Sequence, residues 1–190
     1  MAIEIPDILK QAIKDNKDEI VLYILGLAEI YAQTAFRYAA ERGKLSLMKA
    51  IHKNPKYLFT SVDMPRQAFV LAIQNNHLDV LKYLIDENIY NRYDLQYSYY
   101  SGLPTAVYNA AKYPENRPIL DYLLSLKETC ITPDALVAAA AGESQEIIDL
   151  LVHHGADNRI STIESYYKQR RGRLSEKDIH ARNMAKKYLL

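Results

Sequence analysis

The chain has 190 residues, about half of them apolar, which is enough to bury the core of one compact domain or one short repeat array without disulfides or a structural metal. A formal net charge of +1 argues against a protein that binds nucleic acid along its whole length. The single cysteine, Cys130, excludes an internal disulfide framework, so nothing indicates maturation in an oxidising compartment.

The first fifteen residues lack the basic stretch and the long apolar run of a Sec signal, and no run of 18 apolar residues occurs anywhere. We therefore expect a cytoplasmic protein without a membrane span, whose export into a host cell would need a route other than Sec. Glycine is scarce, and few stretches alternate between apolar and polar residues. This composition favours a mostly α-helical chain.

A pattern of two short helices joined by a tight turn recurs along the sequence. Two stretches align without gaps at an offset of 33 residues, so that Ala39 matches Ala72 and Leu45 matches Leu78. Altered forms of the pattern bring the number of copies to about five, in an array over residues 1–160. The copies lie near residues 5–30, 34–60, 67–90, 104–127 and 132–157.

The residue types of each copy explain why the copies should stack. Alanines in the first helix allow neighbouring helix pairs to approach closely. The second helix carries apolar residues at helical spacing, such as Val80, Leu81, Leu84 and Ile85, and one pair alone cannot bury such a stripe. We therefore predict that successive pairs stack and complete each other's core.

Residues 161–190 differ from the copies. Ser175 followed by acidic residues is typical of a helix start, and the helix is expected to continue to Leu190. We expect Ile179, Met184 and Tyr188 to pack on the last copy, so that residues 161–190 form a helical C-terminal capping unit.

With these features the chain resembles the ankyrin repeat family, whose motif combines T-P-L-H, a turn ending in Gly-His, an apolar helix and Gly-Ala-Asp. Residues 76–81 (NHLDVL) and Gly155-Ala156-Asp157 carry the resemblance, which covers roughly residues 5–160; no copy has the whole T-P-L-H string. The resemblance implies an all-α ankyrin-repeat solenoid of about five helix-pair repeats with a helical cap.

The same resemblance implies a scaffold that binds a protein partner through fingers and a concave face formed by the first helices. Its contact positions on one finger correspond to Asp63, Met64 and Arg66. Those that follow the paired small residues of the first helices correspond to Glu41, Arg42, Gln74, Asn75, Lys112 and Tyr113. Their mixed charges predict no strongly acidic or basic ligand.

Residues 88–113 contain seven of the sixteen tyrosines and the extra length between the third and fourth copies. Tyrosine offers a large contact area at low conformational cost. We expect Tyr97, Tyr99 and Tyr100, together with Tyr113, to form a partner-binding hot spot. The alternative is that these rings fill space around an irregular loop.

A basic run lies in the capping unit, which has eight Lys or Arg residues against three Asp or Glu. Lys168, Arg170, Arg171 and Arg173 are candidates for a nuclear-import signal or a contact with an acidic surface. The alternative is a solvated surface of the cap.

Catalytic and cofactor motifs are absent from the sequence, including a P-loop, a Gly-rich dinucleotide turn, H-E-x-x-H and G-x-S-x-G. His153 and His154 are adjacent, so on a helix they point about 100° apart and suit a helix end better than a shared metal ion. We expect Cys130 to be buried or half-buried. The prediction is a protein that is not an enzyme and has no cofactor or metal.

The leading functional hypothesis is therefore a monomeric protein-interaction module that binds neither membranes nor nucleic acid. Divergent repeats and a composition rich in Tyr, Asn, Lys and Ile resemble ankyrin proteins of intracellular bacteria or large viruses, some of which are effectors acting on host proteins. One alternative is the substrate-targeting part of a larger enzyme or toxin. Another is a nuclear-import-linked or nucleic-acid-associated adaptor that uses residues 168–173.

Overall fold

The computed structural model describes residues 4–57, 63–90, 106–127, 129–159, 161, 165 and 176–189. Over these residues it contains eleven α-helices, two short 3-10 helices and no strand, which confirms the all-α prediction. The chain divides into two compact units, Met1–Asn91 and Arg92–Leu190. The sequence predicted one array with a C-terminal cap and did not predict this division.

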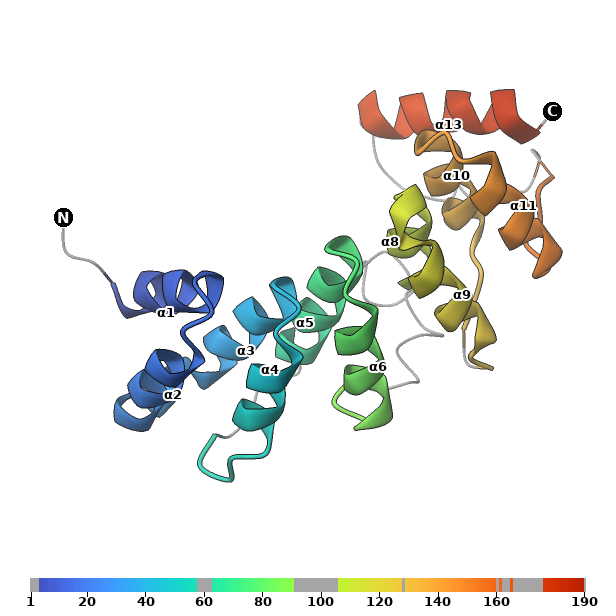
Figure 1. Ribbon diagram of the computed structural model, residues 1–190. Coiled ribbons are helices and arrows are strands. Elements are labelled where there is room, and N and C mark those ends of the chain that lie inside the picture. The colour runs from blue at the N-terminus through green and yellow to red at the C-terminus, as the bar shows by residue number, and fades with distance from the viewer. Residues whose placement is uncertain are drawn as a thin grey trace. The chain divides into compact units, whose positions relative to one another are not determined.

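The N-terminal unit consists of three helix pairs (Figure 1). In chain order its helices are α1 (Ile5–Lys14), α2 (Asp18–Leu27), η1 (Glu29–Tyr31), α3 (Ala32–Glu41), α4 (Leu45–His52), α5 (Asp63–Gln74) and α6 (Leu78–Asp86). The first helices form a row, because α1 packs on α3 and α3 packs on α5, and α4 packs on α6 in the same way. The three pairs therefore stack in sequence order.

The C-terminal unit contains α8 (Ala106–Ala111), η3 (Pro114–Asn116), α9 (Arg117–Ser125), α10 (Pro133–Ala141), α11 (Gln145–His153) and α13 (Glu176–Leu189). Helix α10 packs against both α8 and α13, so the C-terminal helix joins the row of first helices. Ala185 is buried at this contact, with Met184 and Tyr188 half-buried beside it. The expectation for Ile179 was wrong: it is 48% exposed, because it lies six residues before Ala185 and so about 120° around the helix.

Alanines form the contact between consecutive first helices. At two matching positions in each of three helices the side chain is completely buried: Ala35, Ala39, Ala68, Ala72, Ala135 and Ala139. The predicted stripe of α6 is completely buried as well, at Val80, Leu81, Leu84 and Ile85. Small side chains on one helix and an apolar stripe on the other therefore build the core, as the sequence predicted.

Four of the five turns within the pairs share one backbone geometry. The second residue after the first helix has a positive φ: Asn16 (58°), Gly43 (65°), Asn76 (56°) and Glu143 (55°). The residue after it donates its N–H to a carbonyl five positions back: Lys17 to Ala12, Lys44 to Ala39, His77 to Ala72 and Ser144 to Ala139. This is the hydrogen bond of a Schellman-type helix end, and it fixes the direction in which the second helix starts. The fourth pair differs, because η3 lengthens its turn.

Consecutive turns also contact each other in the N-terminal unit. The ring of His77 lies beside Gly43, and its Nε2 is 3.1 Å from the carbonyl oxygen of Glu41 at the end of α3. One turn earlier, Lys44 donates a hydrogen bond from Nζ to Oδ1 of Asn16. In the second and third turns, the residue after the positive-φ position therefore ties its turn to the preceding one.

The second helices are tied together through Tyr83. Its hydroxyl lies 2.9 Å from Nδ1 of His52, the two rings meet edge to face, and Lys49 Nζ lies 5.4 Å from the centre of the tyrosine ring. Burial raises the pKa of Tyr83 above its ordinary value of 10.0, and the negative charge of Glu87 raises this pKa further. The neutral phenol is thus the form that the folded unit favours.

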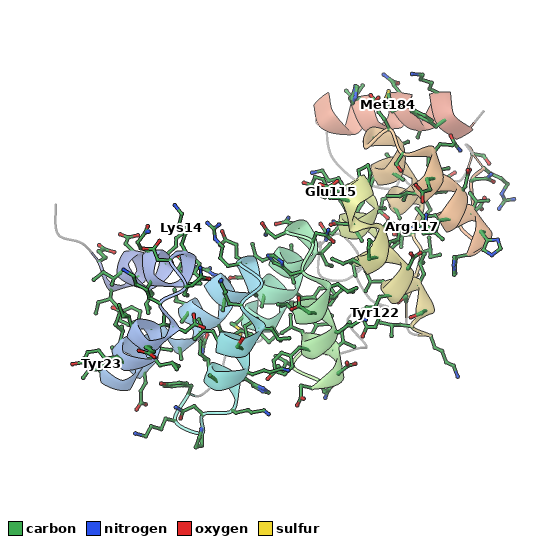
Figure 2. The ribbon with its side chains drawn as sticks, viewed as in Figure 1. Lys14, Tyr23, Glu115, Arg117, Tyr122 and Met184 are labelled. Carbon is green, nitrogen blue, oxygen red and sulfur yellow. The ribbon has the colours of Figure 1, made fainter. Side chains whose placement is uncertain are left out.

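The first pair of the N-terminal unit carries many exposed apolar residues. On α2 and η1, Tyr23 is 70% exposed, Leu27 73% and Ile30 83%. Figure 2 shows Tyr23 on the outer side of α2, pointing away from the other helices of its unit. This end of the row is therefore apolar and uncovered by any described residue.

We expect Gly43→Ala to lower the free energy of unfolding by about 1–2 kcal/mol, because a residue with a Cβ is strained at positive φ. The added Cβ would also lie 2.6 Å from Nδ1 of His77, so the ring would have to leave its bond to Glu41. Gly26→Ala in α2 is the control: nothing lies within 4 Å of its Cβ, and it should be neutral or stabilising by up to about 1 kcal/mol. Urea denaturation followed by circular dichroism measures both, and equal midpoints would contradict the turn contact.

We expect Tyr83→Phe to destabilise the protein by about 1 kcal/mol at neutral pH, because the bond to His52 is lost. A raised tyrosine pKa contributes stability that is complete below pH 10.0 and is lost as pH rises through the higher, folded-state value. The difference between wild type and variant should therefore shrink above pH 10. Urea titrations at several pH values measure this difference, and a constant offset would contradict the buried neutral phenol.

Candidate functional site

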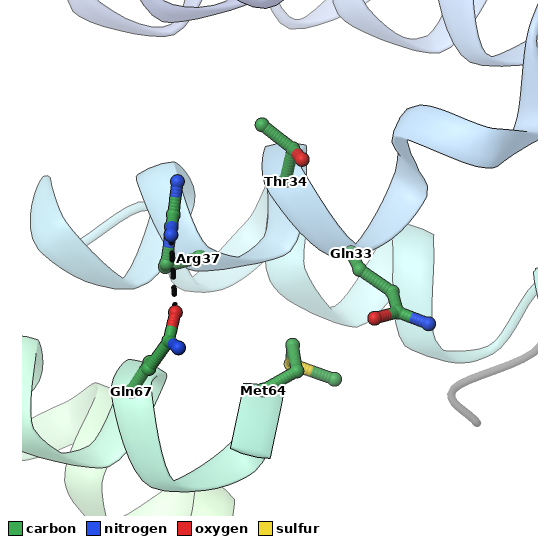
Figure 3. A pocket seen from close by; sticks show the side chains of 5 residues that line it. All are labelled: Gln33, Thr34, Arg37, Met64 and Gln67. Carbon is green, nitrogen blue, oxygen red and sulfur yellow. Dashed lines mark hydrogen bonds between the residues drawn. The ribbon is translucent and has the colours of Figure 1, made fainter. Parts of the chain in front are cut away.

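A shallow hollow lies on the exposed side of the first helices in the N-terminal unit. Five side chains of α3 and α5 line it: Gln33, Thr34, Arg37, Met64 and Gln67 (Figure 3). Its volume is about 150 Å³, whereas sites for small organic ligands usually measure about 300–1,000 Å³. The hollow therefore has room for one side chain of a partner and is too small for a typical cofactor.

The periodicity of α3 places its polar residues at this hollow. Ala32, Ala35 and Phe36 are buried in the core. Gln33 and Arg37 lie one helical turn apart on the other side of α3 and therefore face outward. Both helices are held by the alanine contacts of the core. The lining side chains are thus presented by rigid elements.

Arg37 and Gln67 join the two walls of the hollow. Nη1 of Arg37 donates to Oε1 of Gln67 at 3.0 Å, and Figure 3 shows the two side chains pointing toward each other. A guanidinium has five N–H donors, and no carboxylate among the described residues pairs with this one. Arg37 therefore has donors left for an acceptor on a partner.

Cations and an aromatic ring extend the site toward α1. The guanidinium carbon of Arg37 lies 5.2 Å from the centre of the Tyr38 ring, and Nζ of Lys10 lies 5.4 Å from the same centre. The surface thus presents an amide, a half-buried phenol ring and two positive charges. This combination suits a partner side chain that accepts hydrogen bonds, a carboxylate above all.

Four of the predicted contact residues lie near this surface, at the ends of α3 and α5. Arg42, Gln74 and Asn75 are exposed, and the contact of His77 with Glu41 brings the two turns together. Nδ2 of Asn75 donates to the carbonyl of Leu71 in its own helix at 2.9 Å. These four residues therefore lie on neighbouring turns, about one to two helical turns beyond the hollow, and their role in binding stays a prediction.

The prediction of a finger at Asp63, Met64 and Arg66 was wrong. These residues form the first turn of α5, because the helix begins four residues before the predicted start of its copy. Met64 is 5% exposed and lines the hollow, while Arg66 is half-buried. They lie at the opposite end of α5 from Gln74, about 15 Å away along a helix with 1.5 Å per residue.

The other predicted residues belong to the C-terminal unit or lie outside the described residues. Lys112 is exposed and Tyr113 half-buried, with Nζ of Lys112 5.3 Å from the centre of the Tyr113 ring. The remaining candidates of the tyrosine-rich segment and the basic run lie outside the described residues: Tyr97, Tyr99, Tyr100, Lys168, Arg170, Arg171 and Arg173.

Sequence reasoning named Met64 but missed the other four residues that line the hollow. A usable signal was present, because Arg37 precedes the predicted Glu41 by four residues and Gln67 precedes Gln74 by seven. These spacings keep residues on one face of a helix. Following the helical face back from the predicted positions would have found both.

The structure also tests the remaining candidate residues. Cys130 is exposed, contrary to expectation, because it lies in the extended segment before Pro133 and outside the helix row. Helix α11 ends at His153, and Gly155 follows with φ 90°, as the interpretation of a helix end predicted. In the described part of the chain, no group of three or more His, Cys, Asp or Glu residues could hold a metal ion.

No family model, curated protein or solved structure matches the chain. Within the described residues, no helix has both the length and the apolar character needed to cross a bilayer.

Proposed function

We propose that this chain is an ankyrin-type repeat scaffold that binds a partner protein through the exposed face of its first helices. The observation that supports this function best is the hollow between α3 and α5, which is the size of one side chain and is lined by hydrogen-bonding groups. Such a hollow can anchor a protein chain, whereas its volume is small for a metabolite.

Four features support the ankyrin-type assignment within this proposal. Helix pairs follow one another in rows, alanines separate the first helices, and four turns have the same hydrogen bond and positive φ. The histidine of one turn contacts the turn before it. The resemblance noted in the sequence places a histidine at this turn, and this contact is therefore the fourth feature in support of the proposal.

The chemistry of the hollow indicates which partner side chain would bind best. Arg37 and Lys10 supply positive charge, and Gln67 fixes the guanidinium across the two helices. A carboxylate of the partner would take the free donors of Arg37, and its neighbouring residues would pack on Tyr38. We therefore propose a partner segment that inserts an Asp or Glu side chain here.

We expect peptides selected on the folded protein from a random display library to contain an acidic residue that is needed for binding. Arg37→Ala should weaken these peptides at least about tenfold, or about 1.4 kcal/mol, because a charge-assisted hydrogen bond is lost. Thr34→Arg should also abolish binding by filling the hollow. Fluorescence anisotropy of labelled peptides measures the dissociation constants.

Lys53→Ala is the matched control, because this cation is also exposed in the N-terminal unit but follows a second helix, α4. It should leave the affinities unchanged. Selected peptides that bind Arg37→Ala and Thr34→Arg as tightly as wild type would contradict the proposed site.

A further inference from the structure

The uncovered face of the first helix pair can be compared with the inner pairs, because the shared turn gives each pair a common register. The positive-φ residue serves as the reference position in each turn. Two positions counted from this residue are buried in α4, α6 and α11. The fourth residues are Leu47, Val80 and Ile147, and the eighth residues are Ile51, Leu84 and Leu151. The seventh is Tyr83 in α6, which is 6% exposed.

In α6 the preceding pair supplies the cover of the seventh residue. Tyr83 is covered by His52 and Lys49, both from α4, the second helix before it. In the C-terminal unit, Arg117 of α9 reaches forward in the same way and pairs with Glu146 of α11 at 2.5 Å. In α6 and α11 the face in question is therefore the one turned toward the preceding second helix.

In α2 the residues at the fourth and seventh positions are apolar but exposed, and the eighth, Ile24, is half-buried. Ile20 is the fourth residue and is 44% exposed, and Tyr23, the counterpart of Tyr83, is 70% exposed. Leu27 lies on the same side at i+7 from Ile20 and is 73% exposed. No charged residue interrupts the sequence from Ile20 to Leu27. We call Ile8, Ile20, Tyr23 and Leu27 the N-terminal stripe.

Ile8 shows that another repeat of the same kind is a poor fit. Its position, eight residues before the reference residue, is occupied by completely buried alanines in the next pairs, at Ala35, Ala68 and Ala135. In α1 it is an isoleucine that is 40% exposed. The close approach of first helices needs the small side chain, so a neighbour must cover this face with a different spacing.

The area of the face suits a second copy of the chain. With Ile5 and Ile30, the exposed fractions of the stripe amount to about three and a half whole residues, or roughly 700 Å² at about 200 Å² per large side chain. This exceeds the apolar patch that most monomers expose, and it approaches the ~800 Å² that each partner contributes to a standard interface. A two-fold axis places the same patch on both sides, and an uncharged apolar stripe can cover itself.

The described residues of the C-terminal helix α13 offer no comparable surface. Among the described residues of α13, His180, Asn183 and Lys187 are exposed, and Ile179 is the one large apolar side chain exposed with them. A head-to-tail contact would also repeat without closing. We propose that the protein forms a homodimer in which the N-terminal stripe packs face to face against the same stripe of a second copy, in place of the monomer expected from the sequence.

Sedimentation equilibrium of the full chain at micromolar concentrations tests the dimer. Wild type should have twice the 21.8 kDa mass of one chain, and Tyr23→Asp combined with Leu27→Asp should have the mass of the monomer. Ile179→Asp is the control, since it changes an exposed apolar residue away from the stripe, and it should remain dimeric. Circular dichroism verifies that the variants are folded.

A cross-linking measurement tests the two-fold symmetry of the proposed dimer. It does not introduce the negative charges of the aspartate variants, which could destabilise the fold. In a Cys130→Ser background, Tyr23→Cys should form an intermolecular disulfide on mild oxidation, and Ile179→Cys should not. A wild type that is monomeric at these concentrations would overturn the proposal. So would a dimer that survives the two aspartates, or one in which only the Ile179→Cys variant cross-links.

Discussion

The structure depends on the contact between one helix pair and the next, because no pair can bury its own apolar stripe. Two devices make this contact close enough. Alanines such as Ala39 and Ala72 remove side-chain volume between the first helices, and four of the five turns give the second helix the same starting direction. A left-handed residue in each of these four turns, followed by one backbone hydrogen bond, sets that direction. The contact of His77 with Gly43 and Glu41 then fixes one turn on another.

The proposed binding site follows from this arrangement. A row of first helices held at close spacing leaves their outward residues on a rigid surface, and the hollow beside Arg37 lies where α3 and α5 meet. The same arrangement explains the uncovered stripe, because a repeated contact leaves one face without a neighbour wherever the row ends. Specificity on the first helices and assembly at the end of the row would therefore use different faces of one N-terminal unit.

Much of the fold was predictable from the sequence, because the features that build it are local. Buried alanines, the stripe of α6 and the end of α11 all follow from spacing within about fifteen residues. The start of α5 was missed, since an alignment of copies locates matching residues and not helix ends, and Met64 was consequently assigned to a finger. The boundary between the units had one signal in the sequence, the 38 residues from Ala72 to Ala110 in place of 33. Arg37 was missed because contact positions were taken from the helix ends and not followed along the helical face.

Hydrogen exchange measured by NMR tests the central claim, that the pairs are stacked through one repeated turn. The amides of Lys44 and His77 donate to Ala39 and Ala72, and the side chains of both residues contact the preceding turn. The account predicts that these two amides exchange as slowly as the buried amides inside α3 and α5, although both lie in turns. Exchange at the rate of an exposed loop, with α3 and α5 still protected, would show independent helices and contradict the stack.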